Sequence, residues 1–96
     1  MNSVQLCSAA ETDFTEALRY YATRNPEVAL QFDAEVDSAL RRIAAGAEQF
    51  PAVDDGHRYL QLRRFPFLII FRVIRDRITV IAVAHSSRSP DFWRGR

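Results

Sequence analysis

The spacing of apolar residues changes once along this chain of 96 residues, near residue 57, from a helical period to a strand period. Before that point, apolar side chains recur every three or four residues, as on one face of a helix. After it, they alternate with polar side chains or form short continuous runs, which is typical of strands. Because a chain of this length forms one domain, we expect a single α+β domain over residues 1–96.

The first half contains two predicted helices. Ser8 and Glu11 form a capping-box pattern that predicts the start of the first helix. Asn25 ends this helix and caps the next, which runs from Pro26 to about Ala45, because proline suits the first helical position. Gly46 is expected to provide a left-handed C-cap. Two helices joined by so short a connection fold back into a helical hairpin.

The predicted strands lie on both sides of this hairpin. A weak strand signal covers residues 4–7, and residues 47–56 are expected to form a loop with a turn. Three strands are predicted at residues 58–63, 68–73 and 78–84, followed by a loop at 86–90 and a helical turn at 91–94. The expected fold is therefore an N-terminal strand, an α-helical hairpin, a three-stranded antiparallel meander and a short C-terminal helical turn.

The net charge is only +1, but the charged residues are distributed unevenly along the chain. All thirteen basic residues are arginines, and nine of them lie in residues 58–96 beside two acidic residues, whereas residues 1–57 hold four arginines and ten acidic residues. Guanidinium groups bind carboxylates and phosphates through paired hydrogen bonds. The pattern predicts either a basic surface for an anionic partner, or two halves that neutralise each other, or a solvated sheet face. The candidate partner-binding arginines on the predicted strands are Arg58, Arg63, Arg64 and Arg72.

Few residues are candidates for catalysis. His85 ends the last predicted strand, where it could transfer protons or simply order the loop through Ser87. Cys7 is expected to be a packing residue and His57 a solvated loop residue. One cysteine and two histidines make a structural metal site improbable, and no cofactor motif is present. No apolar run reaches the ~18 residues of a membrane helix, so we expect a cytoplasmic protein without a membrane partner.

Several short stretches resemble the ParE/RelE toxin superfamily, and its ParE branch in particular. They are Tyr20-Tyr21 before Asn25-Pro26, the run from Leu62 to Phe67, Phe71-Arg72, and above all the run from Ala82 to Trp93. The resemblance implies the same fold order and the toxin half of a toxin–antitoxin pair. ParE toxins inhibit DNA gyrase by stabilising its cleaved-DNA complex and are not themselves enzymes.

The same resemblance implies the partners. A ParD-like antitoxin would neutralise the chain in a hetero-oligomer, using a segment that is usually acidic, and promoter DNA would be bound only through the antitoxin. Tail position and family likeness add Arg88, Trp93 and Arg94 to the candidate partner-binding residues. Trp93 either fastens the tail to the helices or belongs to a contact site.

Two alternatives stay open. A RelE-like chain would cleave messenger RNA on the ribosome, and His85 and Arg72 are the candidate catalytic residues for that reaction. The chain has no lysine, no tyrosine after Tyr59 and no glutamate after Glu48, so most side chains typical of such nucleases are missing. The other alternative is a non-toxic interaction module derived from a toxin.

Overall fold

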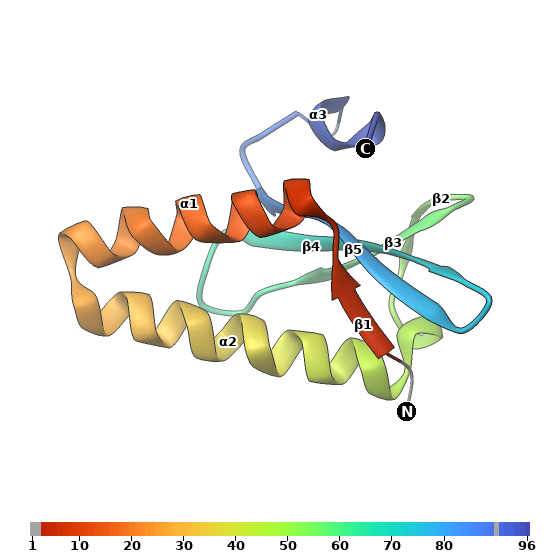
Figure 1. Cartoon of the computed structure of the whole chain (residues 1–96), viewed down its shortest axis with the longest axis horizontal. Coiled ribbons are helices and arrows are strands. Elements are labelled where there is room, and N and C mark those ends of the chain that lie inside the picture. Colours follow the sequence, from red (N-terminus) through yellow and green to blue (C-terminus); the bar gives the residue numbers. More distant parts are fainter. Residues whose placement is uncertain (1–2, 90) are drawn as a thin grey trace.

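The computed structural model describes residues 3–89 and 91–96 and shows two helices packed on a five-stranded sheet (Figure 1). The elements in chain order are β1 (Ser3–Leu6), α1 (Ser8–Arg24), α2 (Pro26–Ala45), the 3-10 helix η1 (Ala47–Gln49), β2 (Ala52–Asp54), β3 (His57–Gln61), β4 (Phe67–Ile74), β5 (Arg77–His85) and α3 (Asp91–Arg94). The predicted α+β order is confirmed. The expected loop at 47–56 instead contains η1 and β2.

The sheet is mixed, with the strand order β1-β5-β4-β3-β2. The predicted meander β3-β4-β5 forms its antiparallel centre. β1 adds to the outer side of β5 in parallel, with Val4 opposite Ile78 and Leu6 opposite Val80. The short β2 covers only one end of β3, through Ala52 opposite Arg58 and Asp54 opposite His57. The remaining end of β3 has no neighbouring strand on that side within the described residues.

The helix boundaries confirm one predicted cap and correct two. The Asn25 side chain accepts a hydrogen bond from the Glu27 amide at 3.0 Å, as expected of an N-cap. The capping box at Ser8 was wrong: the Cys7 amide still donates to Val80 at 3.0 Å, so pairing with β5 extends to Cys7 and the helix begins directly after it. Gly46 has a φ of −176° and is extended rather than left-handed, because the chain passes directly into η1.

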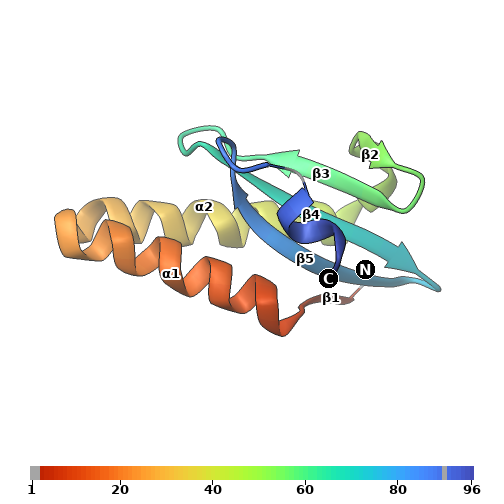
Figure 2. The ribbon, with the colours of Figure 1, turned by 90° about the horizontal axis from the view of Figure 1, so that it is seen from above.

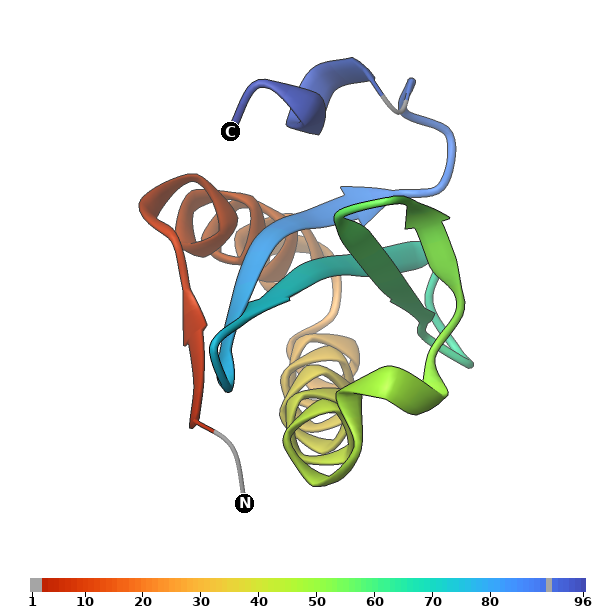
Figure 3. The ribbon, with the colours of Figure 1, turned by 90° about the vertical axis from the view of Figure 1, so that its right-hand side faces the viewer.

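The helical hairpin lies on one face of the sheet and α3 on the other (Figures 2 and 3), and a cluster of buried side chains lies on each face. The main core fills the space between the helical hairpin and the sheet and contains Phe32, Ile43, Ile69, Phe71 and Val80. A smaller core lies on the opposite face, where α3 places Trp93 against Ile70, Ile81, Ala82 and Ala84. In the part of the chain described, no helix is long and apolar enough to cross a membrane. The sheet thus separates a helical side from a side covered in part by the C-terminal tail.

Candidate partner-binding site

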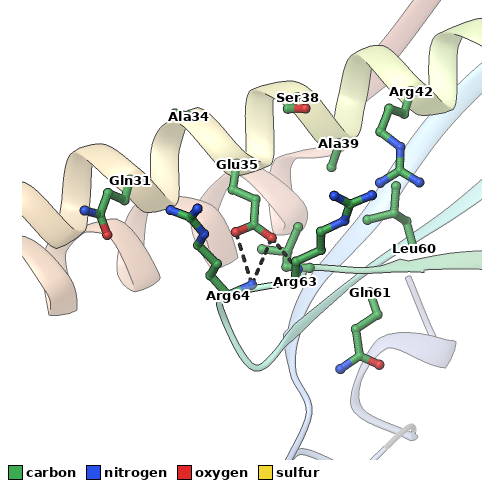
Figure 4. Close-up of a pocket in the computed structure, with 11 residues that line it drawn as sticks. Gln31, Ala34, Glu35, Ser38, Ala39, Arg42, Leu60, Gln61, Arg63 and Arg64 are labelled. Carbon is green, nitrogen blue, oxygen red and sulfur yellow. Dashed lines mark hydrogen bonds between the residues drawn. The ribbon is translucent and has the colours of Figure 1, made fainter.

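A groove of about 440 Å³ runs between α2 and the uncovered end of β3 (Figure 4). On the α2 side, small and polar side chains at helical spacing leave the space open. On the other side lie the end of β3 and the turn that follows it. We call this feature the α2–β3 groove; its lining is Gln31, Ala34, Glu35, Ser38, Ala39, Arg42, Leu60, Gln61, Leu62, Arg63 and Arg64.

Glu35 holds one side of the groove in place. Its carboxylate accepts hydrogen bonds from the backbone amides of Arg63 and Arg64, the latter at 3.2 Å and 3.3 Å to the two oxygens. Both amides belong to the turn after β3, where no strand partner is present to accept them. The carboxylate is therefore occupied by the protein itself, and the two arginine side chains remain exposed. In Figure 4 both side chains extend toward α2, Arg64 beside Gln31 and Arg63 toward Arg42.

The groove has the chemistry of a binding surface. Three guanidinium groups surround an apolar floor of Leu60 and Leu62, both buried. The open end of β3 at Gln61 offers backbone groups to an added strand. No histidine or cysteine lines the groove, so no side chain there exchanges protons readily near neutral pH. The arrangement suits an extended or helical segment that carries acidic and small apolar side chains.

The candidate arginines on the sheet divide between its two faces. Arg58 lies on the helical side, and its guanidinium donates to the carbonyl oxygens of Phe50 at 2.5 Å and Glu48 at 3.4 Å. Its charge is thus used to hold the chain around η1 and is only partly available to a partner. Arg72 lies on the opposite face, but it lines the same cavity of about 300 Å³ as Arg58, at the β2 edge beside His57, whereas Arg63 and Arg64 line the α2–β3 groove. The four predicted strand arginines therefore form no single patch.

The candidate residues of the tail pack against neighbouring aromatic rings or against the sheet. Trp93 is only 3% exposed and fastens the tail to the sheet face opposite the helices, not to the helices as one alternative had it. Arg94 lies 5.2 Å from the centre of the Trp93 ring and at the margin of ion-pair distance from Asp54 and Asp91. Arg88 stacks on Phe92 at 4.5 Å. Of these three candidates, only the two arginines present exposed charge.

The two nuclease candidates, His85 and Arg72, lie at opposite ends of the β4–β5 pair. His85 is opposite Phe67, and Arg72 is opposite Thr79. Five residues of strand separate Phe67 from Arg72, which corresponds to about 17 Å. His85 is also engaged locally: its Nδ1 lies 2.7 Å from the Ser87 hydroxyl and accepts from the Ser87 amide at 3.1 Å. The structure does not bring these two residues into one site.

The surroundings of His57 differ from the expected solvated loop. Its Nδ1 lies 2.8 Å from Asp54 Oδ1, and its ring packs edge-on against Trp93 at 5.2 Å. The Gly56 amide and His57 hold the pKa of the Asp54 carboxyl below its usual value, with a smaller contribution from Arg94. Sequence reasoning missed this contact because it depends on the tail folding back onto β3, more than thirty residues away.

The residues that form the α2 side of the groove were also missed. Gln31, Ala34, Ser38 and Arg42 follow a helical stripe of small and polar residues, and this spacing was the available signal. Within residues 3–89 and 91–96, no cluster of histidine, cysteine or acidic side chains could hold a metal ion. The α2–β3 groove is therefore a candidate site for binding through its arginine side chains and its shape.

Comparison with known proteins agrees with this fold. The family model described as "ParE toxin of type II toxin-antitoxin system, parDE" matches residues 4–90. Toxin ParE2 of Mycobacterium tuberculosis, in strains CDC 1551 / Oshkosh and H37Rv, is 27% identical over 85 residues, which cover 88% of this chain and 81% of the relative. A solved structure described as the chromosomal ParDE TA system from P. aeruginosa superposes with a TM-score of 0.77 at 26% identity, covering 88% of this chain and 96% of the other. The chain belongs to the ParE toxin family of type II toxin–antitoxin systems.

Proposed function

We propose that this toxin inhibits DNA gyrase by binding it and stabilising its cleaved-DNA complex, without catalysing a reaction itself. The observation that carries the proposal is the separation of His85 from Arg72 by the length of the β4–β5 pair. A ribonuclease needs its proton-transferring and phosphate-binding groups around one bond. Here their backbone positions lie about 17 Å apart along the strands, and the α2–β3 groove contains no histidine or cysteine. Binding is the function that this arrangement supports.

We further propose that a ParD-like antitoxin neutralises the toxin through the α2–β3 groove. An acidic segment of the antitoxin would pair its carboxylates with Arg42, Arg63 and Arg64 and place apolar side chains over Leu60 and Leu62. Opposite charges of this kind accelerate encounter and set the register of a partner. The backbone of Gln61 would fix an added strand through hydrogen bonds.

Two assays run side by side test the proposed target. The full chain, freed from its antitoxin, is added to a gyrase supercoiling reaction and to ribosomes translating a defined messenger RNA. We expect loss of supercoiling with accumulation of cleaved DNA, and no cleavage of the RNA. Cleavage of the RNA with unchanged supercoiling would overturn the proposal in favour of the nuclease. Inactivity in both assays would favour the non-toxic module.

The variant His85→Ala serves as the control for these assays. His85 contacts Ser87 and the Phe67 ring at the rim of the sheet. We therefore expect the His85→Ala variant to inhibit gyrase as the unmodified chain does. A messenger-RNA cleavage that disappears in this variant while partner binding survives would assign His85 a catalytic role.

A further inference from the structure

The tip of the β4–β5 hairpin is the most exposed apolar and basic part of the sheet. All five residues from Val73 to Arg77 are exposed, and Val73 and Ile74 are 42% and 57% exposed although both are aliphatic. The hairpin extends to the end of the molecule opposite the α1–α2 turn, and no other element covers its tip (Figures 1 and 2). Neither cluster of buried side chains includes Val73 or Ile74.

Three arginines of this hairpin gather on one side. Cross-strand partners share a face of a sheet, and the register places Arg72 opposite Thr79 and Ile74 opposite Arg77. With Arg75 in the turn, these residues line a shallow hollow of about 560 Å³. Among the described residues, none of the three guanidinium groups forms an ion pair with a carboxylate. The hollow is therefore a cluster of three arginines without ion-pair partners around the aliphatic side chain of Ile74, with Asp76 as the one acidic residue of the adjoining turn.

The turn itself places one residue, Arg75, in a backbone conformation that it does not favour, whereas aspartate tolerates this conformation at position 76. Arg75 and Asp76 have φ values of 50° and 66°, the left-handed conformation that a two-residue hairpin turn requires. Asn-Gly is the usual pair in such turns, because a side chain in this conformation is strained. Arg75 thus occupies a position that asparagine or glycine would adopt with less strain, and its side chain adds a third guanidinium to the hollow.

From the shape and charge of the hairpin, we propose that it binds the phosphate backbone of duplex DNA by entering a groove. A two-stranded β-ribbon fits the major groove of DNA, which is about 12 Å wide. Guanidinium groups bind phosphate oxygens in pairs. The segment from Val73 to Arg77 contains no aromatic ring, so it lacks the stacking surface typical of single-strand binders. This contact does not depend on base sequence and is separate from promoter binding by an antitoxin.

The inference deepens the proposed function and takes its biological meaning from it. A toxin that stabilises cleaved DNA on gyrase gains affinity and orientation if it contacts the DNA as well as the enzyme. In that arrangement, the hairpin would bind the duplex next to the gyrase surface that the rest of the toxin contacts.

A direct binding measurement tests the inference without gyrase. The full chain is titrated into a fluorescein-labelled duplex of mixed sequence, and anisotropy is followed at several salt concentrations. The variant Arg75→Asn/Arg77→Thr removes two charges with residues that suit the turn and the strand. We expect its affinity to fall about tenfold and the slope of log K against log salt to decrease by about two. Circular dichroism confirms that the variant stays folded.

The matched control is Arg19→Gln/Arg41→Gln, which removes the same charge from exposed positions on α1 and α2. We expect less than a twofold change in this control. Equal losses in both variants, or no binding of the duplex by the unmodified chain, would overturn the inference. So would displacement of the DNA by polyglutamate at an equal charge concentration, since the hairpin would then suit an acidic protein. If the hairpin binds DNA but supercoiling is unaffected, the gyrase proposal fails and this inference stands.

Discussion

The guanidinium of Arg96 forms a two-pronged ion pair with the carboxylate of Asp13, at 2.5 Å and 3.1 Å, across 83 residues of sequence. The side chains are only 21% and 14% exposed. Asp13 also accepts from the Val83 amide at 3.1 Å, and Arg96 donates to the Ile81 carbonyl at 3.0 Å. β1 pairs with β5 only as far as Val80. Beyond that point, the side chains of Asp13 and Arg96 form the hydrogen bonds with the β5 backbone that a neighbouring strand would otherwise form. The contact raises the pKa of Arg96 above its usual value.

This relationship predicts unequal effects of the two truncations. Asp13→Ala should destabilise the fold by about 2 kcal/mol, because it leaves the Val83 amide without an acceptor and the Arg96 charge without its carboxylate. Arg96→Ala should cost about 1 kcal/mol, because Asp13 keeps its bond to Val83. Urea unfolding followed by circular dichroism measures both. The control Asp37→Ala breaks the exposed pair with Arg41 and should change stability by less than about 0.5 kcal/mol. Equal losses at Asp13 and Arg96 would contradict this assignment.

Removal of the Trp93 ring should destabilise the protein strongly. Trp93→Ala empties most of the smaller core between α3 and the sheet, for which a loss of about 3 kcal/mol is typical. Because Trp93 is the only tryptophan, circular dichroism must replace fluorescence in this measurement. In the Arg96→Ala protein, by contrast, Trp93 fluorescence reports on whether the tail stays docked. A stability unchanged by Trp93→Ala would show that the tail contributes nothing to the fold.

The fold was predictable where local signals determine it. The Asn25-Pro26 junction specifies a cap and a helix start within two residues, and the structure has both. The position of β1 was not predictable, because a parallel strand at the edge is selected by its packing against α1 and β5 rather than by its own short sequence. β2 was missed for a related reason: its three residues pair with β3 across an irregular register. Such short strands carry no periodic pattern of their own.

The candidate site was predictable in composition but not in geometry. The excess of arginine in the second half indicated an anion-binding surface, yet the folded chain divides these arginines between two places. Arg58 and Arg72 line a cavity beside β2, whereas Arg63 and Arg64 line the α2–β3 groove. Glu35 could not have been found, because its role depends on α2 crossing the turn at Arg63 and Arg64. The strands predicted at 68–73 and 78–84 left a short connection between them, but the sequence alone did not show that its arginines lack ion-pair partners.

Glu35 should control the order of the turn that follows β3. Glu35→Ala leaves two amides without their acceptor, and we expect a loss of about 1 kcal/mol together with faster hydrogen exchange at Arg63 and Arg64. Glu35→Gln keeps an acceptor, so its stability and its exchange rates at Arg63 and Arg64 should lie between those of the unmodified chain and those of Glu35→Ala. Exchange that is equally slow in all three would show that the carboxylate does not hold the turn.

The lowered pKa of Asp54 predicts an acid-sensitive contribution to stability. In the unfolded chain this carboxyl binds a proton at its ordinary pKa of 3.8, whereas in the folded protein it resists protonation. The contribution is therefore present above pH 3.8 and is lost as the pH falls through the lower folded value. Asp54→Asn should reduce the difference in unfolding free energy between pH 6 and pH 2.5 relative to the unmodified protein. An identical pH dependence of the two proteins would refute this contribution.

The proposed antitoxin contact predicts a specific dependence on salt. Arg63→Ala/Arg64→Ala removes two charges from the α2–β3 groove, so association with a purified ParD-like antitoxin should slow about tenfold at low salt. The rate for the unmodified chain should fall steeply as salt increases, and that of the variant less so, because screening acts on the charges that steer encounter. The charge-matched hairpin variant Arg75→Asn/Arg77→Thr should retain nearly normal association, since it lies on the other side of the sheet. Stopped-flow measurements distinguish these cases. An association rate that is flat across ionic strength, or equally slowed by both variants, would place the antitoxin away from the groove.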